Sequence, residues 1–518
     1  MDLDEFQNER LTDFSAADRE QEMQQAIQEV RGQLGNEYEI VIGGERFQSD
    51  EKFNSINPSL SGEIVGVFQK GNRALADRAV ASADEAFGKW SRVSPKERVK
   101  YLMAVSRIMK ERRLELASWM VIEVGKSWVE ADADVAEAID FCEFYARQML
   151  RLGVPQPLVR VKSEKNVMSY IPLGVAIVIP PWNFPLAILS GMTFAAIVSG
   201  NTAIMKPSSD SPAVAAQLMS IFEEAELPPG VVNLLTGSGL EIGDTLVDNP
   251  RTRLVAFTGS KEVGLRINER AAKHRKGQIW IKRVIAEMGG KDAIVVDEGA
   301  DLAAAANGVA AAAFGYQGQK CSACSRVIVV KSVYDEFVQK LQEETRELIH
   351  EGSVEQPEVN FGPVINERAQ ESIMAYIEIG RREGKLLMGG EKGSAEGYFV
   401  QPTIFSDVSP QARIAKEEIF GPVLVVIRAD HYDSAIDIAN ETEYGLTGSV
   451  YTQDRKRVEQ AIQEFHVGNL YINRKCTGAL VGVHPFGGFN MSGTDSKAGG
   501  QDYLLLFAQA KAISEQVK

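Results

Sequence analysis

Two cysteines stand three residues apart within residues 315–326, and this segment is the clearest candidate for a reactive site in the sequence. Cys321 follows a lysine, and we expect it at a loop-to-helix junction, where backbone N–H groups and positive charge favour a thiolate nucleophile. The spacing to Cys324 also suits a dithiol redox pair or half of a zinc site. Zinc needs a second pair of ligands, but Cys142 and Cys476 stand alone. A buried, unreactive cysteine is the remaining alternative.

Two further polar residues occupy positions that suit catalysis. Glu287 ends an apolar strand pattern and precedes two glycines, so it is placed to act as a general base with a raised pKa. Asn183 lies in an apolar, proline-rich turn, where its amide is able to donate to a developing oxyanion. Each residue has a plainer alternative. Glu287 would then be a solvated loop carboxylate, and Asn183 would satisfy only its own turn.

The elements that must position these residues alternate between strand and helix patterns from about residue 170 onward. This alternation predicts an α/β fold with parallel strands, because the crossover between parallel strands needs a helix. The first series of expected strands comprises residues 175–179, 202–206, 231–236, 254–258, 284–288 and 293–296. A second α/β domain is expected from strands 327–330, 423–427 and 470–473 and from helices 334–350 and 370–383.

The remaining segments are a helical N-terminal part and one apolar stretch. Residues 38–47 and 53–67 are expected to form short hairpins, residues 73–149 long amphipathic helices, and residues 154–170 an extended arm. Residues 169–205 contain no Asp, Glu, Lys or Arg, which makes a membrane span conceivable. Prolines and polar residues interrupt this stretch, and we therefore interpret it as two buried parallel strands around a helix.

Composition excludes several function classes. The 518 residues include 56 Lys+Arg against 71 Asp+Glu, a formal net charge of −15, which argues against a surface for nucleic acid. Four cysteines are too few for a disulfide framework in a chain of this length and favour a reducing compartment. The acidic start, MDLDEFQNER, has neither a secretory nor a mitochondrial targeting pattern, and the expected location is the cytoplasm.

Eight segments together resemble the aldehyde dehydrogenase superfamily, and they occur in the family's order between about residues 170 and 493. They are PWNFP, MKPSS, FTGSKEVG, EMGGKDA, GQKC, EEIFGPV, YGLTGSV and PFGGFNMSG. Each segment alone is weak, but the combination is highly specific. The resemblance implies two Rossmann-like α/β domains with parallel sheets, one for NAD(P) and one for catalysis, together with a β-strand arm for oligomerisation.

Carried over position by position, the resemblance also implies catalytic roles. Cys321 corresponds to the nucleophile, Glu287 to the base for deacylation and Asn183 to an oxyanion donor beside the Cys321 backbone N–H. The implied reaction is covalent, with addition of the thiolate to the aldehyde, hydride transfer to the nicotinamide and hydrolysis of a thioester. No metal is implied.

The cofactor implied is NAD, with NADP also acceptable. The turn at residues 259–260 resembles the family's shortened phosphate-binding turn, although such a turn alone is also an ordinary helix start. Lys206 is implied to bind the adenosine ribose, and Glu418 and Phe420 the nicotinamide ribose and ring. Ser209 stands where NAD-restricted members carry Glu, so no carboxylate would repel a 2′-phosphate. The full cofactor set is Ile179, Pro180, Pro181, Trp182, Lys206, Ser208, Ser209, Gly237, Gly243, Phe257, Thr258, Gly259, Ser260, Val263, Glu418 and Phe420.

The resemblance extends over nearly the whole chain to one branch, the 1-pyrroline-5-carboxylate dehydrogenases, which oxidise L-glutamate γ-semialdehyde in proline and arginine breakdown. In this branch the serine at the position of Ser322 and the loop at Gly478 and Ala479 hold the substrate α-carboxylate. Aromatic side chains at the positions of Phe184 and Phe486 pack on its methylenes. Glu137 is placed to meet the α-ammonium of the substrate, or is a helix-surface residue. Another carboxylated semialdehyde, such as succinate semialdehyde, is the alternative substrate. The implied substrate residues are Glu137, Phe184, Ser322, Gly478, Ala479 and Phe486.

Domain limits and partners complete the expectations. Residues 1–150 and 170–287 are assigned to the NAD(P)-binding domain with an N-terminal helical extension, residues 288–490 to the catalytic domain, and residues 151–169 and 491–518 to an oligomerisation arm and tail. We expect a small-molecule substrate, no nucleic acid, no membrane, and a homo-oligomer of at least two chains. The apolar run 503–507 is expected to be covered by another subunit. A non-catalytic structural role is the alternative in a different class.

Overall fold

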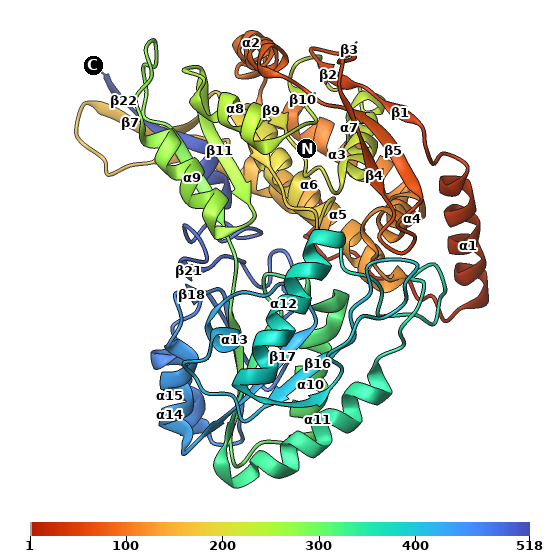
Figure 1. Ribbon diagram of the computed structural model, residues 1–518. Coiled ribbons are helices and arrows are strands. Elements are labelled where there is room, and N and C mark those ends of the chain that lie inside the picture. The colour runs from red at the N-terminus through yellow and green to blue at the C-terminus, as the bar shows by residue number, and fades with distance from the viewer. Residues whose placement is uncertain (1–2, 518) are drawn as a thin grey trace.

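The structure is a computed structural model that describes residues 3–517, and it consists of two lobes, each built on a seven-stranded sheet (Figure 1). The first sheet has the order β12-β11-β8-β9-β10-β2-β3. Its first five strands are parallel, and β2 and β3 add an antiparallel hairpin at one edge. Its strands are β2 (Ile40–Ile42), β3 (Glu45–Phe47), β8 (Val175–Ile179), β9 (Thr202–Met205), β10 (Val232–Leu234), β11 (Thr252–Thr258) and β12 (Arg283–Glu287).

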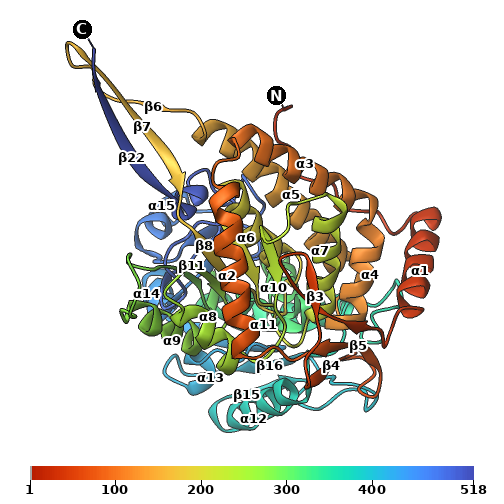
Figure 2. The same cartoon turned by 90° about the horizontal axis from the view of Figure 1, so that it is seen from above.

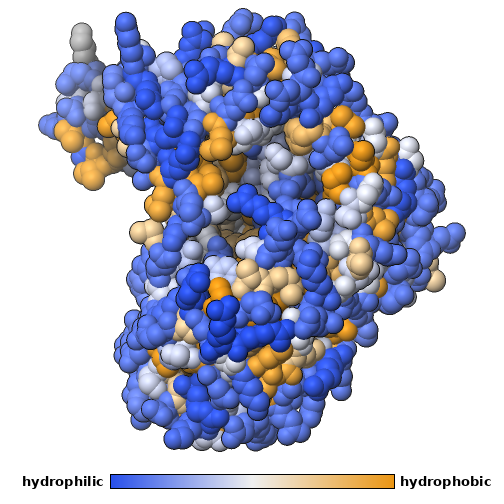
Figure 3. Space-filling view, in the orientation of Figure 1, coloured by the Kyte–Doolittle hydropathy of each residue, from blue (hydrophilic) through white to orange (hydrophobic). Residues whose placement is uncertain are grey.

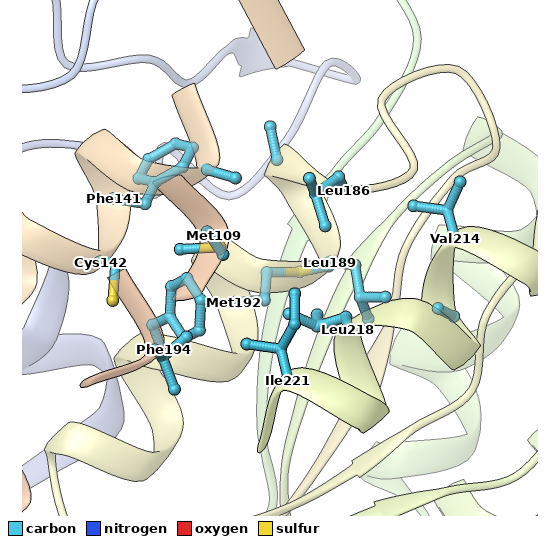
Figure 4. Close-up of a cluster of buried hydrophobic side chains, with 14 of the residues drawn as sticks. Met109, Phe141, Cys142, Leu186, Leu189, Met192, Phe194, Val214, Leu218 and Ile221 are labelled. Carbon is cyan, nitrogen blue, oxygen red and sulfur yellow. The ribbon is translucent and has the colours of Figure 1, made fainter. Parts of the chain in front are cut away.

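The first sheet is apolar on both faces because helices cover both of them. In β8, Val175 and Ile177 belong to one buried cluster, whereas Ala176 and Val178 belong to another. The second of these clusters joins side chains of several helices, and Figure 4 shows Met109, Phe141, Leu189 and Leu218, one from each of four helices. The helices of this lobe are α1 (Ala17–Arg31), α2 (Arg73–Trp90), α3 (Pro95–Glu111), α4 (Arg113–Val124), α5 (Trp128–Leu152), α6 (Ala187–Val198), α7 (Pro212–Glu224), α8 (Asp244–Asp248) and α9 (Lys261–Ala272).

The stretch without charged residues is therefore strand, helix and strand, namely β8, α6 and β9, as the sequence predicts. Within residues 3–517 no helix has both the length and the apolar character that a membrane crossing requires.

The second lobe contains the sheet β15-β16-β17-β14-β13-β19-β20, in which only β15 runs antiparallel to its neighbour. Its strands are β13 (Asp292–Val296), β14 (Cys324–Val330), β15 (Lys385–Met388), β16 (Thr403–Ser406), β17 (Val423–Ala429), β19 (Thr447–Tyr451) and β20 (Asn469–Ile472). Its helices are α10 (Leu302–Phe314), α11 (Tyr334–Leu348), α12 (Glu367–Glu383), α13 (Arg413–Lys416), α14 (Tyr432–Asn440) and α15 (Arg455–Glu464). The predicted α/β fold with two mainly parallel sheets is confirmed. The domain limits given above stay a prediction.

A three-stranded sheet projects from the body as an arm, with the C-terminus near its tip (Figure 2). Its strands are β6 (Gln156–Pro157), β7 (Glu164–Pro172) and β22 (Ala508–Gln516). The 3-10 helix before it, Tyr503–Phe507, is not an exposed patch, contrary to expectation. Tyr503, Leu504 and Phe507 are buried in the core of their own lobe, because the turn folds back onto the helices around α5 and α6.

Two small sheets complete the fold. One pairs β1 (Glu37–Tyr38), β5 (Ile64–Gln69) and β4 (Lys52–Ile56), and the other pairs β18 (Tyr444–Gly445) with β21 (Phe489–Asn490). Of more importance for the site, the chain passes from the first large sheet to the second in four residues, 288–291. Glu287 ends the last strand of one sheet and Asp292 opens the first strand of the next, so the junction of the lobes brings both carboxyls to one place.

Candidate active site

A pocket of about 520 Å³ lies between the lobes, where the space-filling view shows a hollow (Figure 3). Its lining includes two of the three predicted catalytic residues, Asn183 and Cys321. It also includes every predicted cofactor residue except Ser209 and Gly237. Residues that the sequence reasoning missed also contribute to the lining, and they are Ile188, Ser238, Gly239, Leu240, Asp244, Arg266, Ile267, Met288 and Gly289. Four of them, residues 238–240 and 244, lie in or beside the π-helical turn Gly239–Gly243, which has no signal in a strand or α-helix pattern.

The turn between β11 and α9 presents backbone N–H groups to this pocket. Ser260 is the N-cap of α9, and its hydroxyl accepts from the Val263 N–H at 3.4 Å. A Cβ on Gly259 would overlap the Phe257 ring, so the turn needs glycine. A helix N-terminus with close backbone approach suits the pyrophosphate of a dinucleotide.

Side chains at the other walls of the pocket fit the rest of such a cofactor. Lys206 follows β9 and donates to the Pro207 carbonyl at 3.1 Å, and burial lowers its pKa to about 8. Glu418 accepts the Gly290 N–H at 2.9 Å, and burial raises its pKa to about 7. Phe420 packs edge-on against Trp182 with ring centroids 5.6 Å apart.

Cys321 lies in a turn between the 3-10 helix Gly315–Gly318 and strand β14. The expected loop-to-helix junction at Cys321 is therefore wrong, because a strand and not a helix follows the turn. Burial first, and then the charges of Asp292, Glu287 and Glu418, raise the pKa of the Cys321 thiol well above its usual value. The carboxyls of Asp292, Glu287 and Glu418 thus act against the thiolate form that the sequence predicts for Cys321.

Asn183 and Glu287 are both held by specific hydrogen bonds. One N–H of the buried Asn183 amide donates to the Gln319 carbonyl at 2.9 Å, which leaves the second N–H for an oxyanion in the pocket. Glu287 accepts the Ser496 hydroxyl at 2.6 Å and the Gly488 N–H at 3.3 Å. These hydrogen bonds lower the pKa of Glu287, but burial has the larger effect and raises it to about 7. A general base that works near neutral pH requires such a value.

Zinc ligation was the main alternative for the cysteine pair. The Cys324 thiol is buried and donates to the Arg326 carbonyl at 3.4 Å. Among the described residues, no group of three or more His, Cys, Asp or Glu side chains is placed to hold a metal ion.

The six predicted substrate residues lie outside the lining of the 520 Å³ pocket. The Phe184 ring faces the Lys126 ammonium at 4.0 Å, and burial raises the pKa of Glu137, which Lys126 also influences, to about 8. Ser322 follows Cys321, and its carbonyl accepts the Cys476 thiol at 3.4 Å. The exposed Gly478 has φ of +80°, and its carbonyl accepts from Arg474 at 3.1 Å.

The other two substrate residues belong to the same C-terminal part of the second lobe. Ala479 is half-buried and follows Gly478 in the loop. Phe486 is also half-buried, and its backbone forms an antiparallel bridge with Ala498. Which of the six contact a substrate stays a prediction.

Several charged or polar side chains near the predicted catalytic and substrate residues were missed from the sequence. Lys126 and Asp134 form a fully buried ion pair at 2.8 Å, and Lys320, beside the nucleophile, pairs with Glu130 at 2.6 Å. Ser496, the hydroxyl donor to Glu287, lies three residues beyond the last recognised segment. No local pattern distinguishes these residues from solvated ones, because their partners are distant in sequence.

Comparisons with known proteins agree with this geometry. The sequence profile of the aldehyde dehydrogenase family matches residues 46–513. A 1-pyrroline-5-carboxylate dehydrogenase of Geobacillus kaustophilus is 54% identical over 510 residues, which cover 98% of this chain and 99% of that protein. A solved 1-pyrroline-5-carboxylate dehydrogenase from Thermus with bound NAD is 47% identical, with a TM-score of 0.98 and 100% coverage of both chains. Proline utilization A from Bdellovibrio bacteriovorus is 45% identical with a TM-score of 0.97, over 99% of this chain and 53% of that one. This chain belongs to the aldehyde dehydrogenase family.

Proposed function

We propose that this chain oxidises L-glutamate γ-semialdehyde, formed from 1-pyrroline-5-carboxylate, to L-glutamate with NAD as the hydride acceptor. The observation that carries the proposal is one pocket that joins a dinucleotide-type turn to Cys321 and Asn183. The substrate class is supported by the relatives named above and by the polar groups around Ser322 and Gly478.

In the proposed reaction, the Cys321 sulfur adds to the aldehyde carbon and forms a C–S bond. Because burial and nearby carboxyls raise the pKa of the Cys321 thiol, the sulfur must pass its proton to solvent before or during this addition. The second N–H of Asn183 stabilises the oxyanion that results. When bound, NAD supplies the acceptor for the hydride that leaves the tetrahedral carbon. Glu287 then takes a proton from the water that cleaves the thioester, and glutamate is released.

The residues present fit this cofactor. A Cβ on Gly289 would overlap the Glu418 carboxyl, so the pocket wall keeps close backbone approach beside that side chain. Lys206 is buried and lines the same pocket, where its ammonium is available to ribose hydroxyls. We also propose that NADP is accepted, since Ser209 places no carboxylate beside a 2′-phosphate.

The direct test measures NADH formation from freshly neutralised 1-pyrroline-5-carboxylate, with succinate semialdehyde as the competing substrate. We expect kcat/KM for the glutamate semialdehyde to be higher by about 100-fold or more, since a site that pairs polar groups rejects analogues that leave them unpaired. A preference for succinate semialdehyde would identify the alternative substrate. No NADH from any aldehyde would contradict the enzymatic proposal altogether.

A second test separates the α-carboxylate contact from general aldehyde binding. Ser322→Ala removes a hydroxyl that is proposed to donate to the carboxylate, a contact worth about tenfold or more in KM. The KM for propionaldehyde, which lacks a carboxylate, serves as the matched control and is expected to change little. Equal losses with both aldehydes would place Ser322 in the support of Cys321 and not in substrate selection.

We further propose that the chain self-associates, at least as a dimer, through the arm. The edge strand β22 is exposed along eight of its nine residues, and Val159, in the segment that joins β6 to β7, is 87% exposed. Apolar residues gather at the arm in Figure 3, and a long strand edge with such residues favours pairing with another chain. Deletion of residues 508–518 spares the buried Tyr503–Phe507 turn and should yield monomers in light scattering. A dilute, active monomer of the intact chain would contradict the proposal.

A further inference from the structure

Asp292 is a buried carboxyl beside the nucleophile that the proposed reaction does not use. It opens β13 directly after the crossing between the lobes, and it is 3% exposed. Its β14 partner is Cys324, and the ladder then shifts so that Ala293 pairs with Arg326 and Ser325 is left over. A bulge at this place re-aims side chains next to the site, as bulges near active sites do.

One oxygen of Asp292 is firmly held and the other is not. Oδ1 accepts the Thr447 N–H at 2.6 Å, while Oδ2 is buried without a hydrogen-bond partner. The neighbouring Arg326 guanidinium does not supply one, because its three nitrogens donate to backbone carbonyls of residues 291, 438 and 439. The Lys291 ammonium is likewise buried without a partner, and it forms no ion pair with Asp292 in the described chain.

The Oδ2 atom of Asp292 lies close to the backbone of the nucleophile. A Cβ built on Gly290 would collide with both Asp292 Oδ2 and the Cys321 carbonyl oxygen, so the two oxygens border the same small space. Two hydrogen-bond acceptors that face each other in a buried space repel unless one carries a proton. Only the carboxyl is able to carry it.

We propose that Asp292 is a positioning residue, a neutral carboxylic acid whose Oδ2–H donates to the Cys321 carbonyl and holds the nucleophile turn against β19. This inference rests on the proposed role of Cys321. The second contact of the Asp292 carboxyl is with Thr447, whose N–H donates to Asp292 Oδ1. The Thr447 hydroxyl in turn donates to the Ser322 carbonyl at 3.5 Å. In this arrangement Asp292 is linked directly to the Cys321 carbonyl and, through Thr447, to the Ser322 carbonyl.

The charge state of Asp292 agrees with this geometry. Burial raises its pKa to about 8 in spite of the bond from Thr447 and the nearby Arg326 charge. The other ionisable groups that face it are Glu418, Lys291, Tyr471 and the thiols of Cys321 and Cys476. Negative charge on Asp292 raises the pKa of the Cys321 thiol, so the neutral acid also favours thiolate formation.

The test compares Asp292→Asn with Asp292→Ala in the full-length protein. An asparagine amide accepts from Thr447 and donates to the Cys321 carbonyl without charge, so we expect it to recover most of the activity lost in the alanine variant. The alanine variant should lose kcat by about 100-fold, the cost of a misplaced reacting group, while the KM for NAD changes little. Comparable losses in both variants would overturn the proposal.

The second readout needs no substrate. Iodoacetamide alkylation of Cys321 is followed against pH, with Cys321→Ala as the blank. Above about pH 8 the wild-type Asp292 ionises and suppresses the thiolate, whereas asparagine does not, so D292N should react about tenfold faster there. Below that pH the two should agree. Coincident curves at every pH would overturn the inference, even if D292A fails to fold.

The two readouts also distinguish this inference from the proposed function. If the wild type fails to oxidise the semialdehyde but the alkylation curves separate as expected, the substrate proposal is wrong and the positioning role stands. If oxidation proceeds and the curves coincide, the function stands and the role of Asp292 falls.

Discussion

The two ends of the pocket are built in different ways. At the cofactor end, the groups follow the ends of parallel strands on either side of β8, with Lys206 after β9 and the 259–260 turn after β11. Much of this surface is backbone. At the nucleophile end, Cys321, Asn183 and Glu287 come from three separate segments and meet at the junction of the lobes.

The difference extends to electrostatics. The cofactor end combines a helix N-terminus with the carboxyl of Glu418, whereas the nucleophile end holds two carboxyls whose pKa values burial raises, Glu287 to about 7 and Asp292 to about 8. A site formed by the backbone of a turn is therefore specified by the local sequence. A site formed by closely packed side chains has pKa values that depend on residues distant in the sequence.

The largest expected effect separates the two cysteines of the nucleophile end. Cys321→Ala should abolish NADH formation, a loss on the order of 10⁴-fold or more, because no other thiol reaches the pocket lining. The matched control Cys324→Ala should retain most activity, since that thiol is buried behind the turn. Equal losses would point to a dithiol or metal role.

Removal of the base should cost less and leave a specific signature. Glu287→Gln should slow turnover by about 10² to 10⁴-fold, because it blocks attack of water on the thioester. Hydride transfer precedes that step, so rapid mixing should still show a burst of NADH equivalent to the enzyme. Absence of the burst, with NAD binding intact, would contradict the assignment of Glu287.

The pH dependence sharpens the electrostatic half of the comparison. Glu287 acts as a base only when ionised, so turnover limited by deacylation should rise about tenfold per unit below its pKa of about 7 and level off above it. Ser496→Ala removes a hydrogen bond that favours the ionised form. The inflection in the kcat profile should move to higher pH, and a downward shift would contradict this account.

The smallest expected effect concerns the cofactor end. Ser209→Glu places a carboxylate near the expected 2′-phosphate and should lower kcat/KM for NADP by about tenfold, with little change for NAD. Ser209→Ala is the matched control for loss of the hydroxyl. Because Ser209 does not line the pocket in this structure, equal effects of the two variants on NADP would show that the residue lies too far from the phosphate.

Much of the fold was accessible from pattern alone. The runs predicted at residues 175–179, 254–258 and 423–427 lie within β8, β11 and β17, because a strand buried on both faces is apolar at every position. The strands β16 and β19 were not expected. Their residues alternate less clearly, and the N-terminal hairpin β2-β3 gave no sign that it would extend the first sheet.

The candidate active site likewise has features that the sequence predicts and features that depend on the tertiary structure. By itself, the sequence determined the identity and order of Cys321, Glu287 and Asn183, the glycine turn before α9, and an acidic composition with few Cys and His residues. Only the tertiary structure decided that Cys321 follows a 3-10 turn and has a raised thiol pKa, that Ser496 holds Glu287, and that Asp292 lies beside the nucleophile backbone. The physical reason is that a pKa depends on desolvation and on charges brought near by folding, and neither is encoded in the neighbours along the chain.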